Sequence, residues 1–291
     1  MSSRPPTPPP GWPPPAQGWV PAEPPRRRSR AAVVLPWLVV GVLAAVYGAR
    51  WLPSVADGRL PWLAGLPPAA AREYPRPGVE EAGGRLAPDV TAADPGGAYA
   101  FLETRPGPDG TPAPVGWSPC RPVHVVVDPA GAPSDFATQV QGVLAEVSAA
   151  TGLVFADDGL VTEAASPDRA PFQPEVYGDR WAPVLVRFTD AGTVPDLAGD
   201  VAGVAHTLMM ADPVSADAFI VSGSVYLDVT LLDRPGQYLP VLRHEVAHLV
   251  GLDHVDDPTQ LMHPVTPVDT FQQGDLTGLA AVGRGPCAPG L

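Results

Sequence analysis

The sequence predicts an α/β domain that follows a single transmembrane helix. From about residue 98 to the C-terminus, apolar segments of strand length alternate with stretches of helical periodicity. An uncharged apolar run stands near the N-terminus, and the 41 Pro residues are concentrated before Cys120. A chain of 291 residues is long enough for one substantial domain with accessory segments.

Residues 1–30 are the first predicted segment, a Pro-rich tail on the cytoplasmic side of the membrane. Their low complexity leaves too little apolar surface to bury, so the sequence predicts disorder or polyproline II conformation. A Pro-rich docking motif is the alternative to a solvated tail.

Residues 31–49 are the predicted transmembrane helix. This run carries no charge, and about nineteen residues at 1.5 Å each span roughly 30 Å, the thickness of the bilayer hydrocarbon. Because the preceding arginines stay on the cytoplasmic side, the remainder of the chain is expected outside the cell. A cleavable signal peptide, and thus a secreted protein, is the alternative. Its apolar region is usually shorter, and Tyr47 disfavours a small-x-small cleavage site ending at Ala49.

Charge changes sign after this run. Residues 1–50 carry six Arg and one Glu, a net charge of +5, whereas the remainder carries twelve Arg and thirty acids, a net charge of −18. An acidic outer domain would repel nucleic-acid phosphates, so nucleic acid is excluded as a partner. Residues 50–97, rich in Pro, Gly and Ala without clear periodicity, are expected to be an extracellular spacer. The absence of Lys is typical of a GC-rich coding sequence, and so of a high-GC bacterium.

Residues 98–291 form the predicted folded domain. Val123–Val127 is apolar and β-branched, as in a buried strand. Ser134 can cap a helix whose apolar residues keep one face and which Gly152 follows. Those apolar residues are Phe136, Val140, Leu144 and Val147. Further strands are expected at Leu153–Phe155, Val184–Phe188, Val204–Met210 and Phe219–Leu231, the last broken at Gly223, and further helices at Tyr238–Leu249 and Leu276–Val282.

The most informative segment is His-Glu-Val-Ala-His-Leu-Val-Gly-Leu-Asp-His, residues 244–254. His244 and His248 are four apart, so on a helix both imidazoles leave one face and can bind the same Zn²⁺. Glu245 lies beside that metal and can take a proton from zinc-bound water. Gly251 can adopt the left-handed conformation that ends a helix, and the turn returns His254 as a third ligand. Three imidazoles leave a fourth position open, as in catalytic zinc sites.

These five fixed positions match the metzincin zinc-protease signature, and the chain after them resembles the matrixin branch, in a bacterial membrane-anchored form. Met262, in Gln-Leu-Met-His-Pro, matches the Met-turn that packs beneath the ligating histidines. Val204–Thr207 resembles the edge strand that pairs with substrate, and Gln273–Leu279 resembles the C-terminal helix. The resemblance covers about residues 98–291 and is sharpest in 241–283.

The resemblance implies a mixed, mostly parallel sheet, a backing helix, an active-site helix and a small C-terminal subdomain. It also implies a zinc-dependent endopeptidase that hydrolyses peptide bonds by Glu245-assisted attack of zinc-bound water. A non-catalytic zinc-containing adhesion or binding module is the alternative, against which the intact Glu245 argues. A zinc hydrolase of non-peptide amides is a third reading that the motif leaves open.

Departures from the matrixin pattern limit what is carried over. His206 stands where a ligand of the family's second, structural zinc would lie, but Tyr226 replaces another, so one catalytic zinc is expected. The wall of the S1′ pocket is Pro264-Val265-Thr266 in place of Pro-x-Tyr, and His263 replaces a common Tyr after Met262. No acidic residues show the loop spacing that fixes a Ca²⁺ site. Substrate preference and oligomeric state do not follow from the sequence.

The two cysteines, Cys120 and Cys287, are expected to form a disulfide. They stand at the start and near the end of the regular region, in a part of the chain placed outside the cell, where disulfides persist. The alternative is a cysteine switch in which the Cys120 thiolate caps the zinc. The flanking Ser-Pro-Cys-Arg-Pro only loosely resembles the family's inhibitory segment, and the strand at Val123 begins at once.

The arginine cluster before the apolar run predicts the membrane topology. Protease added to intact cells should remove residues 51–291 and spare a tag placed at residue 1. An N-terminal tag that external protease cleaves would reverse the topology. A mature soluble protein beginning near residue 50 would replace the anchor with a signal peptide.

Overall fold

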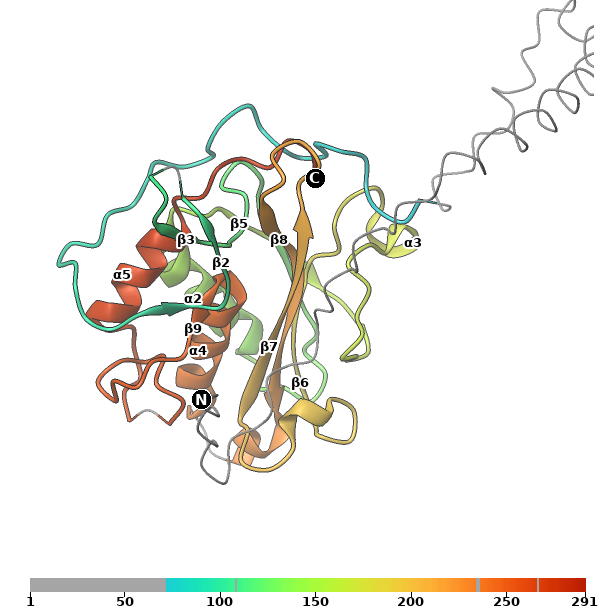
Figure 1. Cartoon of the computed structure of the whole chain (residues 1–291). Coiled ribbons are helices and arrows are strands. Elements are labelled where there is room, and N and C mark those ends of the chain that lie inside the picture. Colours follow the sequence, from blue (N-terminus) through green and yellow to red (C-terminus); the bar gives the residue numbers. More distant parts are fainter. Residues whose placement is uncertain (1–71, 108, 234–235, 266) are drawn as a thin grey trace, which may run out of the picture. The chain divides into compact units, whose positions relative to one another are not determined.

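The computed structural model describes residues 72–291, apart from residues 108, 234–235 and 266 (Figure 1). The predicted cytoplasmic tail, the transmembrane helix at 31–49 and the first part of the spacer lie outside the described residues. Among the helices of the described part, none has both the length and the apolar character needed to cross a bilayer.

A five-stranded sheet forms the centre of the domain (Figure 1). Its strands are β4 (Val123–Val127), β5 (Phe155–Leu160), β6 (Val184–Thr189), β7 (Gly203–Ala211) and β8 (Ala218–Asp228). They lie in the order β5-β4-β6-β8-β7, and only β7 runs antiparallel to its neighbour. The predicted mixed, mostly parallel α/β architecture is therefore confirmed.

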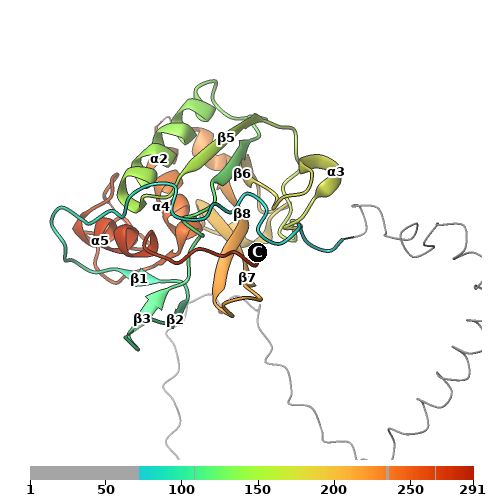
Figure 2. The same cartoon turned by 90° about the horizontal axis from the view of Figure 1, so that it is seen from above.

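Two helices, α2 (Phe136–Thr151) and α4 (Tyr238–Val250), cover one face of this sheet, and a third, α5 (Gln273–Val282), packs against them (Figures 1 and 2). Apolar side chains of α2 and α4 pack with alternate residues of β4, β6 and β8 in one large core. The intervening residues, such as Val126 and Leu185, face a smaller cluster on the other side of the sheet. That side carries the short helix α3 (Pro174–Tyr177) and the 3-10 turn η3 (Pro195–Leu197); a second turn, η4 (Val229–Asp233), follows β8.

One of the two predicted boundaries of α2 is confirmed and the other is wrong. The helix ends at Gly152, whose φ of 73° is left-handed, as expected. The predicted cap at Ser134 is wrong: α2 begins at Phe136, and its flanking residue Asp135 makes no side-chain capping bond. The Asp135 carboxylate instead accepts a hydrogen bond from Gln139 at 3.1 Å.

Two strand predictions also need correction. β5 begins at Phe155 rather than Leu153, because Leu153 turns into the core directly after the helix. The polar residues of β5 are tolerated because it is an edge strand. β8 is not broken at Gly223; a Cβ there would lie 2.5 Å from the His206 carbonyl oxygen and 2.7 Å from Leu249, so the glycine serves close packing. The irregularity falls instead between Leu208 and Met209 of the paired strand.

Residues 72–97, predicted as spacer, instead lie against the domain. In Figure 1 they are the cyan segment without helices or strands along its upper side. The Glu81 carboxylate is buried there and accepts bonds from the Ser118 hydroxyl (2.6 Å), the Arg121 guanidinium (3.1 Å) and the Ala288 amide (2.6 Å). The composition of this segment did not reveal its packing, because these contacts involve residues far away in the sequence.

The chain then forms two small sheets. β1 (Ala100–Phe101) pairs with β9 (Leu252–Asp253), and β2 (Thr104–Pro106) pairs with β3 (Pro112–Pro114). The first pairing joins the segment before the sheet to the segment after α4.

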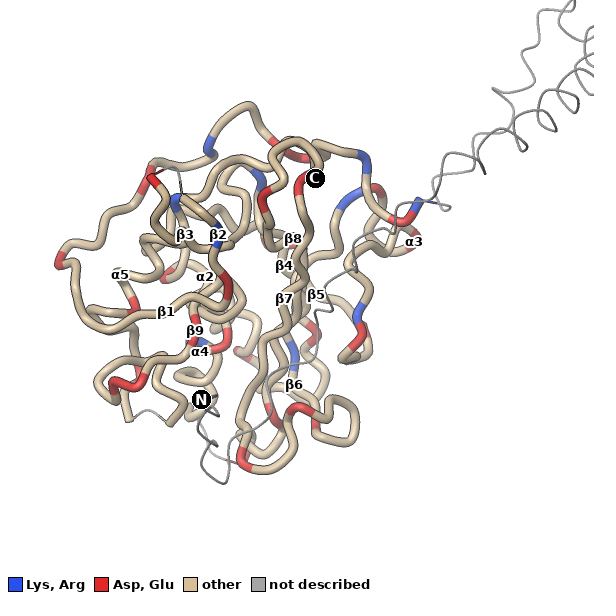
Figure 3. The backbone as a smooth tube through the Cα atoms, viewed as in Figure 1, with Lys and Arg blue, Asp and Glu red and all other residues tan. Residues whose placement is uncertain are grey.

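Surface charge is unevenly balanced (Figure 3). Among the described residues, every Arg except Arg284 forms an ion pair with a carboxylate. Carboxylates outnumber the arginines, so the field of the domain is negative.

Cys120 and Cys287 are joined in a disulfide with their Cα atoms 5.3 Å apart, as predicted. The bridge excludes a free Cys120 thiolate and thus the cysteine-switch alternative. It ties the start of β4 to the C-terminal segment, next to the buried Glu81 network.

Because the bridge closes a separation of 167 residues, replacing both cysteines by Ser should lower the free energy of unfolding by about 5 kcal/mol in the chain-entropy model. Denaturant titration of the two proteins measures this difference. Reductant should reproduce the loss in the wild type and leave the double variant unchanged. Two unpaired cysteines in the non-reduced protein, found by mass mapping, would contradict the assignment.

Candidate metal centre

Helix α4 supplies the first two histidines. Its apolar face, which includes Leu242, Val246 and Leu249, is fully buried against the sheet. His244 and His248 leave the helix on the opposite side, one turn apart, as their spacing predicts. The rigid packing of the helix therefore sets the separation of the two imidazoles.

Gly251 ends α4 and redirects the chain. Its φ is 119°, a conformation in which every residue other than glycine is strained. Its amide donates a hydrogen bond to the His248 carbonyl. A Cβ at this position would also lie 2.8 Å from the Val115 carbonyl oxygen. The next two residues form β9, which β1 holds in place, and His254 follows. The expected return of a third histidine is thus observed.

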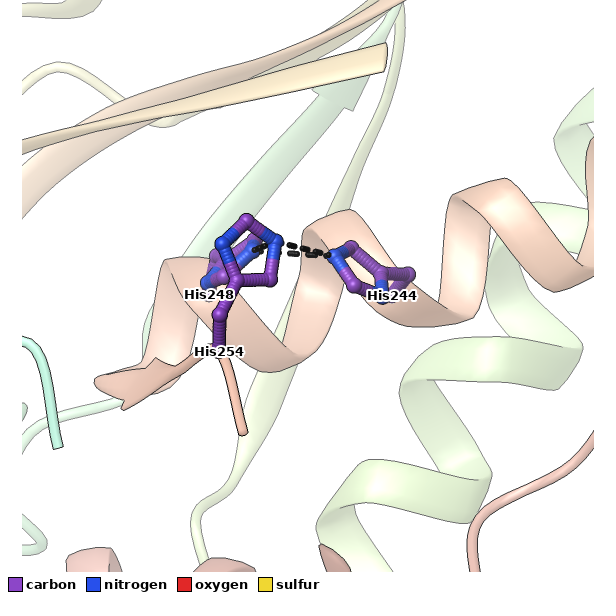
Figure 4. A group of neighbouring side chains, drawn as sticks. All are labelled: His244, His248 and His254. Carbon is purple, nitrogen blue, oxygen red and sulfur yellow. Dashed lines mark hydrogen bonds between the residues drawn. The ribbon is translucent and has the colours of Figure 1, made fainter. Parts of the chain in front are cut away.

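The three imidazoles converge through their Nε2 atoms (Figure 4). The distances between these atoms are 3.0 Å for His244 and His248, 3.0 Å for His244 and His254, and 3.1 Å for His248 and His254. The three atoms form a nearly equal-sided triangle, able to hold one metal ion.

The hydrogen bonds of the Nδ1 atoms identify the tautomer of His244 and His248. His244 Nδ1 donates to the Leu261 carbonyl and His248 Nδ1 donates to the Leu252 carbonyl, each at 2.8 Å. In the neutral imidazoles the proton is thus on Nδ1, so these two Nε2 atoms face one another with lone pairs. A cation shared among them removes that repulsion, and this donor set fits one.

Burial keeps these imidazoles neutral. It lowers the pKa of His244 to about 4 and that of His248 to about 3, and the neighbouring imidazoles add to the effect for both. Burial likewise lowers the pKa of His254. Neutral imidazole is the form that binds a metal.

Glu245 is buried between α4 and β7. Only 6% of the residue is exposed, and burial raises the pKa of its carboxyl to about 8, although a hydrogen bond from the Ala205 amide opposes the shift. The neighbouring positive charge of a bound cation would favour its ionised form. The carboxyl is therefore placed to exchange a proton near neutral pH.

Met262 and Asp275 hold the chain segments next to the ligands. Met262 is buried in the main core, and its carbonyl accepts a bond from Val255, the residue after His254. The buried Asp275 carboxylate accepts bonds from the amides of Leu261 (2.8 Å), Met262 (3.2 Å) and Gln272 (2.8 Å). It thereby holds the peptide whose carbonyl orients His244. Sequence reasoning missed Asp275; its place as the third residue of a helix that Gln272 precedes was the available signal.

The remaining candidate positions lie apart from the triangle. His206 Nε2 lies 3.0 Å from the Asp196 carboxylate, and its ring packs edge-on to Tyr226. His263 Nδ1 stays within its own turn, 2.7 Å from the Val265 carbonyl oxygen and 3.2 Å from the Val265 amide nitrogen. Glu81, Cys120 and Cys287 also cluster, but the two sulfurs are bonded to each other.

The sequence matches no protein-family model, and a search of curated proteins finds no relative.

The geometry predicts that the protein binds one equivalent of zinc, and that His254→Ala lowers the occupancy sharply because two imidazoles remain. Elemental analysis after dialysis against a weak chelator measures the stoichiometry. His206→Ala is the matched control and should retain one zinc per chain. Full occupancy in the His254→Ala protein would contradict the three-histidine site.

Proposed function

We propose that this protein is a zinc-dependent endopeptidase of the metzincin type, similar to the matrixin branch. The observation that carries the proposal is the triangle of neutral imidazoles, with the buried Glu245 on the same helix. A metal site of purely structural use needs no buried carboxyl beside its ligands.

His244, His248 and His254 would hold the zinc. When bound, zinc supplies Lewis-acid chemistry: it lowers the pKa of a water and polarises the scissile carbonyl. The protein's own contribution is orientation, since backbone carbonyls of Leu261 and Leu252 fix the rings of His244 and His248.

Glu245 is the proposed general base. Its carboxylate accepts a proton from the attacking water and then delivers that proton to the leaving amine nitrogen. Its buried position keeps bulk water from competing, and the Ala205 amide keeps the carboxylate directed along β7.

The proposed substrate is an extended peptide that adds to the outer edge of β7. This strand ends the sheet, and among the described strands only β8 pairs with it. An added strand would gain main-chain hydrogen bonds along the edge, and it would lie beside Glu245 because Ala205 belongs to the same strand.

The proposed setting is the outer face of a cell membrane. The apolar run at 31–49 would anchor the chain with its N-terminus in the cytoplasm and residues 50–291 outside. The disulfide supports an exported domain, because such bridges persist in oxidising compartments.

Glu245→Gln should keep one zinc per chain and lower the rate of peptide hydrolysis by about 10²–10⁴-fold, the usual contribution of general-base catalysis. The assay is a library of quenched fluorescent peptides with the full-length chain, read together with elemental analysis. Glu175→Gln, an exposed position on α3, is the matched control and should hydrolyse at the wild-type rate.

Two results count against the proposal. A zinc-loaded wild type that cleaves no peptide in the library would contradict the peptidase and favour a binding module. Near wild-type turnover by Glu245→Gln with unchanged zinc would contradict the role given to Glu245.

A further inference from the structure

We propose that Gly203 is a positioning residue for Glu245: by lacking a side chain, it leaves the space in which the carboxyl of the proposed general base lies. Gly203 is the first residue of β7, at the edge of the sheet beside α4. The inference concerns the space that the Glu245 side chain occupies. Only its kinetic test rests on the proposed function.

The evidence is steric. A Cβ on Gly203 would lie 2.8 Å from Cγ and 3.0 Å from Oε1 of Glu245. It would also lie 2.8 Å from Cγ1 of Val241, which is one turn earlier on α4. Real Cβ atoms essentially never approach a neighbour to less than 3.0 Å, so even a methyl group at 203 requires Glu245 and Val241 to shift.

The backbone gives no other reason for glycine here. Gly203 is not among the glycines with positive φ, and it pairs with Leu227 as an ordinary strand residue. Glycine inside a strand weakens it and often marks a close approach of another group. At this position the approaching group is the Glu245 side chain.

A second residue of β7 also contacts the Glu245 side chain. Two residues further along the same strand, the Ala205 amide donates to the Glu245 carboxyl. The strand thus acts on Glu245 at two residues: Gly203 leaves space for the side chain, and the Ala205 amide donates a hydrogen bond to its carboxyl oxygen. A methyl group at 203 would push the carboxyl away from that amide and from the metal site on α4.

Two other glycines serve as matched controls. Gly223 of β8 is still more crowded, but its Cβ would meet the His206 carbonyl oxygen at 2.5 Å and Leu249 at 2.7 Å, not Glu245. Gly142 of α2 has nothing within 4 Å of its Cβ, so Ala should be tolerated there.

The test is a double-mutant cycle in the full-length chain, with Gly203→Ala and Gly223→Ala made in the wild type and in Glu245→Ala. Thermal unfolding of the zinc-loaded proteins is the first readout. Gly203→Ala should lower Tm by several degrees in the wild type and by clearly less in Glu245→Ala, where Cγ and Oε1 are gone. Gly223→Ala should lower Tm equally in both backgrounds, and Gly142→Ala should not lower it. An equal loss for Gly203→Ala in both backgrounds would overturn the proposal.

The second readout is kinetic. Gly203→Ala should keep one zinc and lower kcat by about 10²-fold, the effect of misplacing a reacting group by about 1 Å, with KM nearly unchanged. Wild-type kcat in a folded Gly203→Ala protein would overturn the proposal. An inactive wild type would contradict the peptidase and leave the stability cycle as the deciding test. If Gly203→Ala does not fold, its rescue by Glu245→Ala supports the inference and continued failure overturns it.

Discussion

The structure depends on the convergence of three imidazole nitrogens within 3.1 Å of one another. Lone pairs held this close repel unless a cation lies among them, so the site is complementary to a metal ion. Burial reinforces this, because it keeps His244 and His248 unprotonated and therefore able to bind the metal. Holding such an arrangement requires support from outside the helix that bears it.

That support comes from both ends of the folded chain. The Leu252 carbonyl, which orients His248, lies in β9, and β9 is held by the early strand β1. The Leu261 carbonyl, which orients His244, belongs to a peptide that Asp275 of α5 holds. α5 in turn packs closely on the early segment, since a Cβ on Gly274 would lie 2.0 Å from the Ala98 carbonyl oxygen. Segments remote in sequence thus fix the two ring orientations together.

The sequence was most informative where the determinants are local. The spacing of His244, His248 and His254, with Gly251 between the last two, predicted the triangle because helix geometry and a left-handed glycine are properties of neighbouring residues. The strands of the five-stranded sheet and the three longer helices followed from periodicity in the same way, whereas the short elements β1, β2, β3, β9 and α3 were not predicted. Glu81 and the crowding at Gly203 escaped prediction because each depends on contacts with residues distant in the chain. For Asp275 the capping position after Gln272 was a local signal, but its bonds to Leu261 and Met262 were not. The shifted start of β5 had a similar cause, since Leu153 is drawn into the core by packing rather than by β propensity.

X-ray absorption spectroscopy at the zinc edge of the metal-loaded protein tests the central claim most directly, because it reports the ligands of the bound ion. The account predicts a shell of nitrogen and oxygen atoms at about 2.0–2.1 Å, with the outer-shell scattering of three imidazoles and one further light atom. A sulfur neighbour at about 2.3 Å, or scattering from fewer than three imidazoles, would contradict it.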